Sequence, residues 1–213
     1  MSKALIVTGG SINVAWAKEW LDNQTFDYCI AADSGLEYAD KLGLKVDYLL
    51  GDYDSVDKDV LDTYKSNTEF ETYPKEKDYT DTHLAIMTAL KKGATDIYIL
   101  GATGTRMDHT ITNIGNMKVA ADCGKDCHIV DEHNYISEAD GIHIIRKDSQ
   151  YGRYVSIIPM SENVSLSLEG FKYTLDNYEL KQGLSICQSN EVEDEQGIIK
   201  VHKGLIIVLE TKD

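Results

Sequence analysis

Carboxylates gather where predicted strands end. The stretch "LLGDYDSVDKDV" (49–60) places Asp52 and Asp54 directly after an apolar run, a pattern typical of a buried strand that stops at a turn. Asp33 ends another such run, and Asp81 lies at the start of a long helical stretch. Because the carboxyl ends of parallel strands share one edge of a sheet, we expect these side chains to converge there.

Crowded carboxylates have an energetic consequence. Two like charges about 4 Å apart repel by roughly 4 kcal/mol at an effective dielectric near 20. Such a cluster can hold a proton on one member, as paired acids do, or it can bind a cation. Oxygen ligands favour a hard ion, magnesium before calcium, and magnesium commonly binds substrate phosphates as well.

The stretch "GATGTRMDH" (101–109) adds groups suited to phosphate. Glycine turns such as those at Gly101 and Gly104 expose backbone N–H groups, and Arg106 supplies a planar cationic fork. Together with the carboxylates these residues predict phosphoryl-type transfer. Taken singly, each turn has a structural reading, because Asp81 or Asp108 could simply cap a helix. The chain has no "GxxxxGK[ST]" motif, and no "GxGxxG" follows its first strand.

Residues up to 132 alternate between strand and helix patterns, which predicts an α/β unit with a mainly parallel, helix-covered, Rossmann-like sheet. The expected strands are 4–10, 28–35, 47–52, 68–74, 96–104 and 126–131, and the expected helices are 14–21, 36–43, 59–65, 80–93 and 107–124.

After residue 133 the pattern changes to short β runs, of which "VSLSLEG" (164–170) alternates as a half-buried strand does. We therefore expect two domains, an α/β domain over 1–132 and an antiparallel β-sandwich or barrel over 133–213. The assignment of residues 132–150 stays open. The expected strands are 141–147, 154–160, 164–175, 182–188, 197–203 and 205–211.

Charge and composition exclude some partners. The 213-residue chain has 36 acidic and 21 basic residues, a net charge of −15, which argues against nucleic acid and against an anionic membrane surface. Its first residues, "MSKALIVTGG", lack the apolar length of a signal peptide, and no apolar run reaches the length of a membrane span. Four cysteines in a chain of this length favour reduced thiols and a cytoplasmic location.

Four motifs resemble the thiamine pyrophosphokinase family in their order and spacing: "AADSG", "GDYDS", "KDYTDTHLA" and "GATGTRMDHTITNI". The later "GFKYTL…GLSICQSNEV" resembles the thiamine-binding domain of that family. The resemblance extends from residue 31 to about residue 210. It implies that ATP and thiamine give AMP and thiamine pyrophosphate, with the thiamine hydroxyl attacking the β-phosphorus.

The resemblance also implies roles for the charged residues. Asp52, Asp54 and Asp81 would hold Mg²⁺, and ATP would be the co-substrate. Asp78 would lie beside them, either as an outer group or as the base that takes the hydroxyl proton. Lys77 would clamp phosphate together with Arg106.

The remaining implied roles concern the two substrates. The nucleotide would be bordered by Asp33, Gly101, Gly104 and Thr105. Asp108 would help to fix the substrates, and His109 and Asn113 would lie with it near thiamine, although a structural hydrogen bond is an equal reading for His109. Ser189 and Asn190 would bind the aminopyrimidine edge.

Two other functions stay open. A related pyrophosphokinase acting on another hydroxymethyl heterocycle, such as a pterin, would share the nucleotide half, and "SNEV" (189–192) in the β domain favours thiamine. A non-catalytic nucleotide- or thiamine-binding module would have lost the aspartates, which are present. The family resemblance further implies a homodimer with the thiamine site at the subunit boundary.

Overall fold

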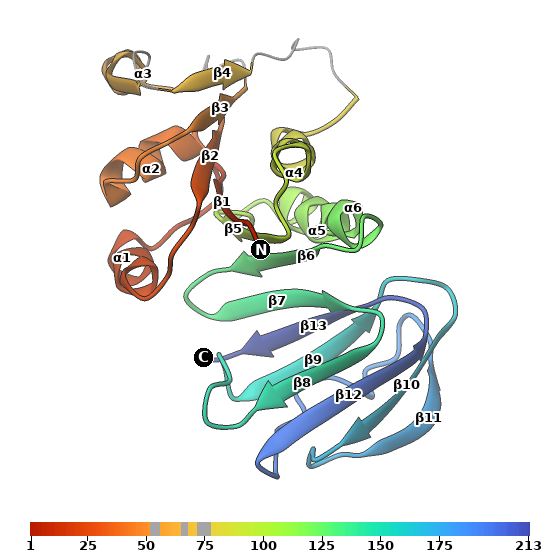
Figure 1. Cartoon of the computed structure of the whole chain (residues 1–213). Helices are drawn as coiled ribbons and strands as arrows, with labels where there is room; N and C mark the ends of the chain where they lie inside the picture. The colour runs from red at the N-terminus through yellow and green to blue at the C-terminus, as the bar shows by residue number, and fades with distance from the viewer. Residues whose placement is uncertain (52–55, 65–67, 72–77) are drawn as a thin grey trace. The chain divides into compact units, whose positions relative to one another are not determined.

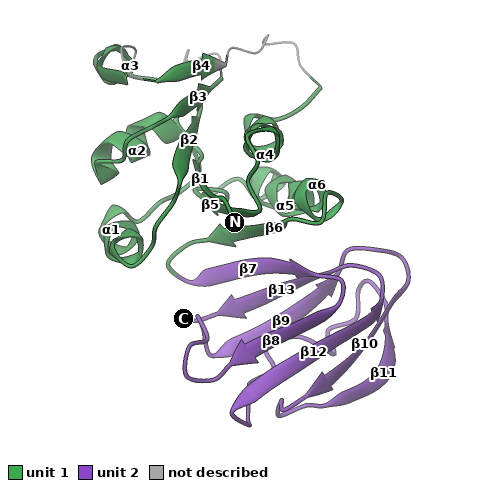
Figure 2. Ribbon diagram, viewed as in Figure 1, with its two compact units in different colours: residues 1–132 green, residues 133–213 purple. Residues whose placement is uncertain are grey.

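The computed structural model describes residues 1–51, 56–64, 68–71 and 78–213. Three predicted site residues, Asp52, Asp54 and Lys77, lie outside this range. The chain divides into two compact units, Met1–Glu132 and His133–Asp213, which Figure 2 shows in different colours.

Unit 1 contains a parallel sheet in the strand order β4-β3-β2-β1-β5-β6. Every pairing among these strands is parallel, which confirms the expected α/β class. Strands such as β1 are buried over nearly their whole length because helices cover both faces of the sheet. The strands are β1 (Lys3–Val7), β2 (Tyr28–Ala32), β3 (Tyr48–Leu50), β4 (Glu69–Glu71), β5 (Asp96–Leu100) and β6 (Asp126–Val130).

Helices flank this sheet, with α1 and α2 on one side and α4, α5 and α6 on the other (Figure 1). The sequence predicts one helix over 107–124, but the structure has two, which meet at the fully buried Met117. In the described part of the chain, no helix has the length and apolarity needed to span a membrane. The helices are α1 (Val14–Asp22), α2 (Gly35–Leu42), α3 (Lys58–Tyr64), α4 (Asp81–Lys91), α5 (Met107–Asn116) and α6 (Lys118–Ala121).

The strand order reverses beside β1. From β1 the chain builds outward through β2, β3 and β4, and it then returns to place β5 on the other side of β1. The segments that follow β1 and β5 lead to α1 and α5, which lie on opposite sides of the sheet (Figure 1), and open parallel sheets form a ligand crevice at such a point.

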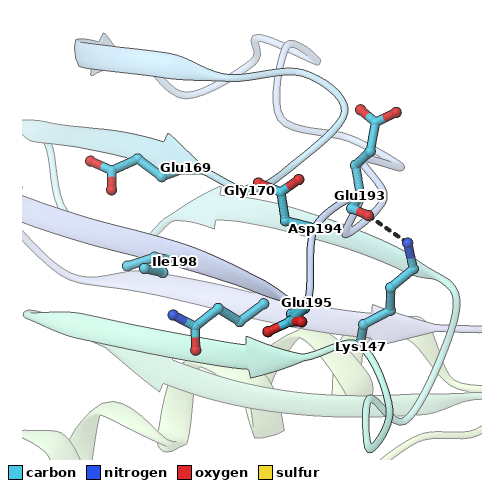
Figure 3. A pocket seen from close by; sticks show the side chains of 8 residues that line it. Lys147, Glu169, Gly170, Glu193, Asp194, Glu195 and Ile198 are labelled. Carbon is cyan, nitrogen blue, oxygen red and sulfur yellow. Dashed lines mark hydrogen bonds between the residues drawn. The ribbon is translucent and has the colours of Figure 1, made fainter.

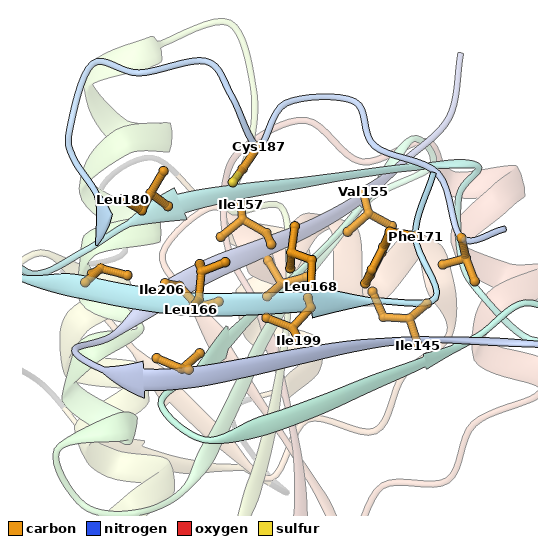
Figure 4. Close-up of a cluster of buried hydrophobic side chains, with 14 residues drawn as sticks. Ile145, Val155, Ile157, Leu166, Leu168, Phe171, Leu180, Cys187, Ile199 and Ile206 are labelled. Carbon is orange, nitrogen blue, oxygen red and sulfur yellow. The ribbon is translucent and has the colours of Figure 1, made fainter. Parts of the chain in front are cut away.

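Unit 2 is an antiparallel β-sandwich, one of the two forms predicted for it. Within this unit one layer has the strand order β7-β13-β9 and the other has the order β11-β10-β12-β8, and the pairings inside each layer are antiparallel. Apolar side chains from both sheets form its core, among them Ile157, Leu166 and Ile199 (Figure 4). The strands are β7 (Asn134–Ala139), β8 (Ile142–Arg146), β9 (Tyr154–Pro159), β10 (Val164–Glu169), β11 (Leu175–Leu180), β12 (Gln196–Lys203) and β13 (Ile206–Thr211).

Two predicted strands of unit 2 were wrong, and two observed strands were missed. The expected strand over 182–188 is a turn region, because Gly183 has a φ of +83° and Leu184 is 50% exposed. The expected strand over 164–175 ends at Glu169, since Gly170 turns the chain with a φ of +72°. Strands β7 and β11 were not predicted.

Candidate active site

A cleft of about 530 Å³ lies where β1, β2 and β5 end. We call it the glycine cleft, because glycines of the loops after β1 and β5 line it. Its wall is formed by residues 8–11, 32–34, 80–82 and 101–106, with Tyr38, His109, Thr110 and Asn113. The cleft lies at the point where the strand order reverses.

The loops after β1 and β5 are joined through their backbones. The N–H of Gly10 donates to the Gly101 carbonyl at 2.9 Å, and the N–H of Ser11 donates to the Thr103 carbonyl at 2.8 Å. A Cβ atom at position 10 would lie 2.2 Å from the first of these carbonyl oxygens and 2.3 Å from the second. Only glycine, which has no Cβ atom, allows this approach. Gly10 therefore lets the loops after β1 and β5 lie close together in the wall of the cleft.

Asp33 reaches the cleft through an unusual backbone conformation. Its φ of +50° lies in the left-handed region, which aspartate tolerates better than most residues. The N–H of Asp33 donates to the Leu50 carbonyl at 2.8 Å, which ties the end of β2 to β3. Gly51, which directly precedes Asp52, lies against the same residue: a Cβ there would be 3.3 Å from the Asp33 Cα.

The start of α4 brings Asp81 into the cleft wall. Thr80 caps this helix, and its hydroxyl oxygen accepts from the His83 N–H at 3.3 Å. Asp81 is then the first helical residue, at the positive end of the helix dipole. Asp78 is exposed and is not among the residues that line the cleft.

Arg106 and Asp108 form an exposed two-point ion pair. The Arg106 Nη2 donates to one carboxylate oxygen at 2.6 Å and its Nε donates to the other at 3.3 Å. This pairing raises the pKa of Arg106 and lowers the pKa of Asp108. Arg106 lines the cleft, whereas Asp108 does not, so in this structure Asp108 orients the arginine.

His109 and Asn113 lie one turn apart on α5 and both line the cleft, but their settings differ. His109 is exposed, whereas Asn113 is 7% exposed. The Asn113 Nδ2 donates to the Ala102 carbonyl at 2.8 Å, which holds the loop after β5 against the helix. Asn113 therefore makes a structural contact with the loop after β5, and its predicted contact with thiamine stays a prediction.

The two residues predicted to bind the aminopyrimidine belong to unit 2. Ser189 has a left-handed φ of +52°, and its N–H donates to the Ser156 hydroxyl at 2.9 Å. The Asn190 amide is 4% exposed and is paired with the backbone of Tyr173, accepting at 3.0 Å and donating at 2.8 Å. These backbone contacts fix a loop, so the side chain of Asn190 has a structural role here.

Sequence reasoning missed part of the cleft. Thr8, Ser11, Ser34 and Thr103 line it, but none was predicted as a site residue. The glycine pair at 9–10, which follows the first strand, was the available signal, because the carboxyl-edge rule applies to β1 as it does to β5.

A second hollow, of about 830 Å³, lies in unit 2 (Figure 3). Four carboxylates line it: Glu169, Glu193, Asp194 and Glu195. Its lysine, Lys147, donates to the Glu193 backbone carbonyl at 2.6 Å. Carboxylates repel a phosphate ligand, and no residue of the predicted site lies there, so the glycine cleft is the better candidate.

No group of three or more histidine, cysteine, aspartate or glutamate side chains that could hold a metal occurs in the described residues. Among the three predicted magnesium ligands, Asp81 lies in the cleft wall and the other two fall outside the described range. Asp33 is a second carboxylate in the wall, so the cleft offers oxygen donors of the kind that magnesium prefers.

The fold and the cleft define an α/β protein with a candidate ligand cleft beyond the carboxyl edge of a parallel sheet and with an added β-sandwich. Family comparison identifies both parts. Residues 19–130 match the catalytic domain of thiamin pyrophosphokinase, and residues 142–206 match its vitamin B1 binding domain. The chain therefore belongs to the thiamine pyrophosphokinase family, the enzyme family that makes thiamine diphosphate.

Individual relatives agree with this assignment. A thiamine pyrophosphokinase of Bacillus subtilis is 35% identical over 166 residues, which cover 76% of this chain and 77% of the relative. The crystal structure of a thiamine pyrophosphokinase from Bacillus subtilis superposes with a TM-score of 0.88, at 29% identity over 100% of both chains. The thiamin pyrophosphokinase of Geobacillus thermodenitrificans gives a TM-score of 0.85 at 28% identity, covering 99% of this chain and 98% of that one.

Proposed function

We propose that this chain transfers the pyrophosphoryl group of ATP to the hydroxyl of thiamine, giving thiamine pyrophosphate and AMP. The observation that supports this most directly is the glycine cleft, which brings loop N–H groups, Arg106 and Asp81 to one edge of a parallel sheet. Transfer of a phosphorus group depends mostly on positioning and on neutralising charge, and these groups suit both tasks.

The triphosphate would lie along the loops after β1 and β5. Backbone N–H groups of glycine turns bind phosphate oxygens, and the first turn of α4 adds a positive helix end. Arg106 would hold phosphate oxygens with its fork once it exchanges part of its contact with Asp108, and Lys77 would add a second cation. Asp33, Gly101, Gly104 and Thr105 would border the nucleotide.

Magnesium is the cofactor that the acidic residues favour. Asp52, Asp54 and Asp81 would hold it, and its charge would offset the negative charge of the phosphates. Asp78 stays the proposed base or outer partner, because it lies three residues before Asp81 in an exposed segment. Asp108 would keep Arg106 in position for the transferring group.

Thiamine is the proposed acceptor because the vitamin B1 binding domain matches unit 2. Thiamine is a cation, so a protein with a net charge of −15 favours its approach electrostatically. Ser189 offers an exposed hydroxyl in a fixed loop, and Asn190 supports that loop through its contacts with Tyr173. His109 would lie at the thiamine side of the cleft.

A homodimer and a cytoplasmic location complete the proposal. The family resemblance supports the dimer, with thiamine bound at the subunit boundary. The four cysteines are free thiols, which agrees with a reducing compartment.

The decisive experiment incubates the chain with ATP, magnesium and thiamine and identifies the nucleotide product. AMP with thiamine pyrophosphate supports the proposal, whereas ADP indicates a simple kinase. Replacing thiamine by a hydroxymethylpterin tests the alternative acceptor, and AMP formed only with the pterin would contradict the proposal. If neither AMP nor ADP forms with thiamine or with the pterin, a non-catalytic binding module is the remaining function.

A further inference from the structure

Two consecutive carboxylates at the end of β6 contact the two loops of the glycine cleft. The Thr103 hydroxyl, in the loop after β5, donates to the Asp131 Oδ2 at 2.7 Å. The Asn13 Nδ2, beyond the loop after β1, donates to the Glu132 carboxylate. Neither carboxylate lines the cleft. Thr103, which Asp131 contacts, is part of the cleft wall, and Asn13, which Glu132 contacts, lies two residues after the wall residue Ser11.

These contacts are linked through the backbone. Thr103 accepts the N–H of Ser11 at its carbonyl oxygen and donates from its hydroxyl to Asp131. Asn13 lies two residues after Ser11, and its side-chain oxygen caps α1 by accepting the N–H groups of Ala15 and Trp16. The two residues that follow β6 therefore contact the segments after both β1 and β5.

We propose that Asp131 is a positioning residue for the reaction, and that it acts through the Thr103 hydroxyl. A hydroxyl that donates to a carboxylate forms a strong, directional hydrogen bond. The Thr103 hydroxyl proton then points to Asp131 and does not point to a ligand in the cleft. Thr103 therefore acts on the cleft through its backbone carbonyl, which holds the Ser11 N–H. The negative charge of Asp131 would repel the phosphates of ATP. Any favourable effect of Asp131 must therefore come from the position that it gives to the loop carrying Thr103. This inference rests on the proposed function, because the geometry matters through ATP binding.

Paired substitutions at both positions provide the test. Thr103→Val keeps the side-chain shape and removes the hydroxyl, while Thr103→Ser keeps the hydroxyl. Asp131→Ala removes the acceptor, and Asp131→Asn keeps an acceptor oxygen without the charge. We expect Thr103→Val and Asp131→Ala each to lower kcat/KM for ATP about tenfold, the lower range for one charge-assisted hydrogen bond. Thr103→Ser should stay within about twofold of wild type, and KM for thiamine should change little in all of them.

The double variant separates positioning from two independent effects. If Asp131 acts through Thr103, Thr103→Val with Asp131→Ala should lose about the same tenfold as either single variant. A loss near a hundredfold would overturn the inference, and so would Thr103→Val with wild-type kinetics. Asp126→Asn is the matched charge control, because Asp126 is exposed at the opposite end of β6. If Asp131→Ala fails to fold, the comparison of Asp131→Asn, Thr103→Val and Thr103→Ser still decides.

Hydrogen exchange gives a readout that does not depend on the reaction. The Ser11 amide donates to the Thr103 carbonyl, so Thr103→Val should speed its exchange about tenfold while amides in α4 exchange as in wild type. Faster exchange without AMP formation by the wild-type chain would mean that the proposed function fails and the loop contact stands. If the wild-type chain is active but Thr103→Val changes neither amide exchange nor kinetics, the proposed function stands and the inference about Asp131 is wrong.

Discussion

A single methyl group at position 10 would separate the two loops of the glycine cleft. In Gly10→Ala the new Cβ would start 2.2 Å from the Gly101 carbonyl oxygen and 2.3 Å from that of Thr103. Both neighbours are backbone atoms, so the loops must move apart by roughly 1 Å to reach normal contact in a close-packed structure. That movement weakens the hydrogen bonds at 2.9 Å and 2.8 Å between these loops, which together contribute about 1–3 kcal/mol.

The kinetic effect of Gly10→Ala should exceed the loss of stability. A misplacement of about 1 Å in a positioning element reduces turnover by about 10²-fold. The measurement is AMP formation at saturating thiamine over a range of ATP concentrations, together with the thermal unfolding midpoint. Wild-type kcat/KM for ATP in a folded Gly10→Ala chain would refute the view that the closeness of the loops forms the site.

A matched alanine substitution controls for general effects of losing a glycine. Gly115 lies in α5 with open space around the position of its Cβ. Gly115→Ala should therefore stabilise the helix by about 0.5–1 kcal/mol, because alanine loses less conformational freedom there. Its kinetics should equal those of wild type, so the two glycine variants should differ in the sign of the stability change as well as in activity.

Four further changes test individual side chains. Asp81→Asn should cut kcat by about 10²-fold and raise the magnesium concentration needed for half-maximal rate; unchanged magnesium dependence would exclude a metal role. Arg106→Lys should lower kcat/KM for ATP by about tenfold or more, because an ammonium cannot form the two-point contact. Ser189→Ala should raise KM for thiamine more than KM for ATP, and equal shifts would contradict the assignment to the pyrimidine. Burial raises the pKa of Glu210, because the folded state favours the neutral carboxyl group. The stability that this group contributes is therefore present below about pH 4.5 and is lost as the pH rises through the folded-state pKa. Glu210→Gln, which can still accept the Tyr151 N–H now donated at 2.8 Å, should raise the unfolding midpoint at neutral pH and flatten this decline.

The α/β unit was largely predictable because its strands are buried on both faces. Such strands appear in the sequence as continuous apolar runs, and β1 and β5 each end within a few residues of a glycine. The helices between them are closed by clear signals, such as Gly43, which ends α2 with a left-handed φ of +70°. The break at Met117 gave no such signal, because Met117 itself keeps helical dihedrals.

The β unit was harder because its strands differ in how much they bury. Strand β11 (Leu175–Leu180) is mostly exposed or half-buried, so it shows little apolar alternation. Conversely, Leu184 and Ile186 suggested a strand over 182–188, although both are about half exposed and only Cys187 is buried there. An apolar residue at the surface is common in proteins, so pattern alone could not separate these cases.

The candidate site was predicted in part, and the division follows the chemistry of the side chains. Asp33, Asp81 and Arg106 lie in the cleft, where carboxyl-edge reasoning placed them. The tie between Thr103 and Asp131 was not predictable, because it joins residues 28 positions apart through one hydroxyl.

Asparagine side chains and charged side chains differ in how well the residue type predicts contact with a ligand. A charged side chain is rarely buried without a partner, so Asp33, Asp81 and Arg106 remain at a solvent-facing edge where a ligand can reach them. An amide side chain can bind backbone groups, and both predicted amide ligands make such contacts. Asn113 holds the Ala102 carbonyl, and Asn190 is paired with Tyr173. The sequence shows which donors and acceptors a residue has. Only the fold determines which of them the backbone already uses.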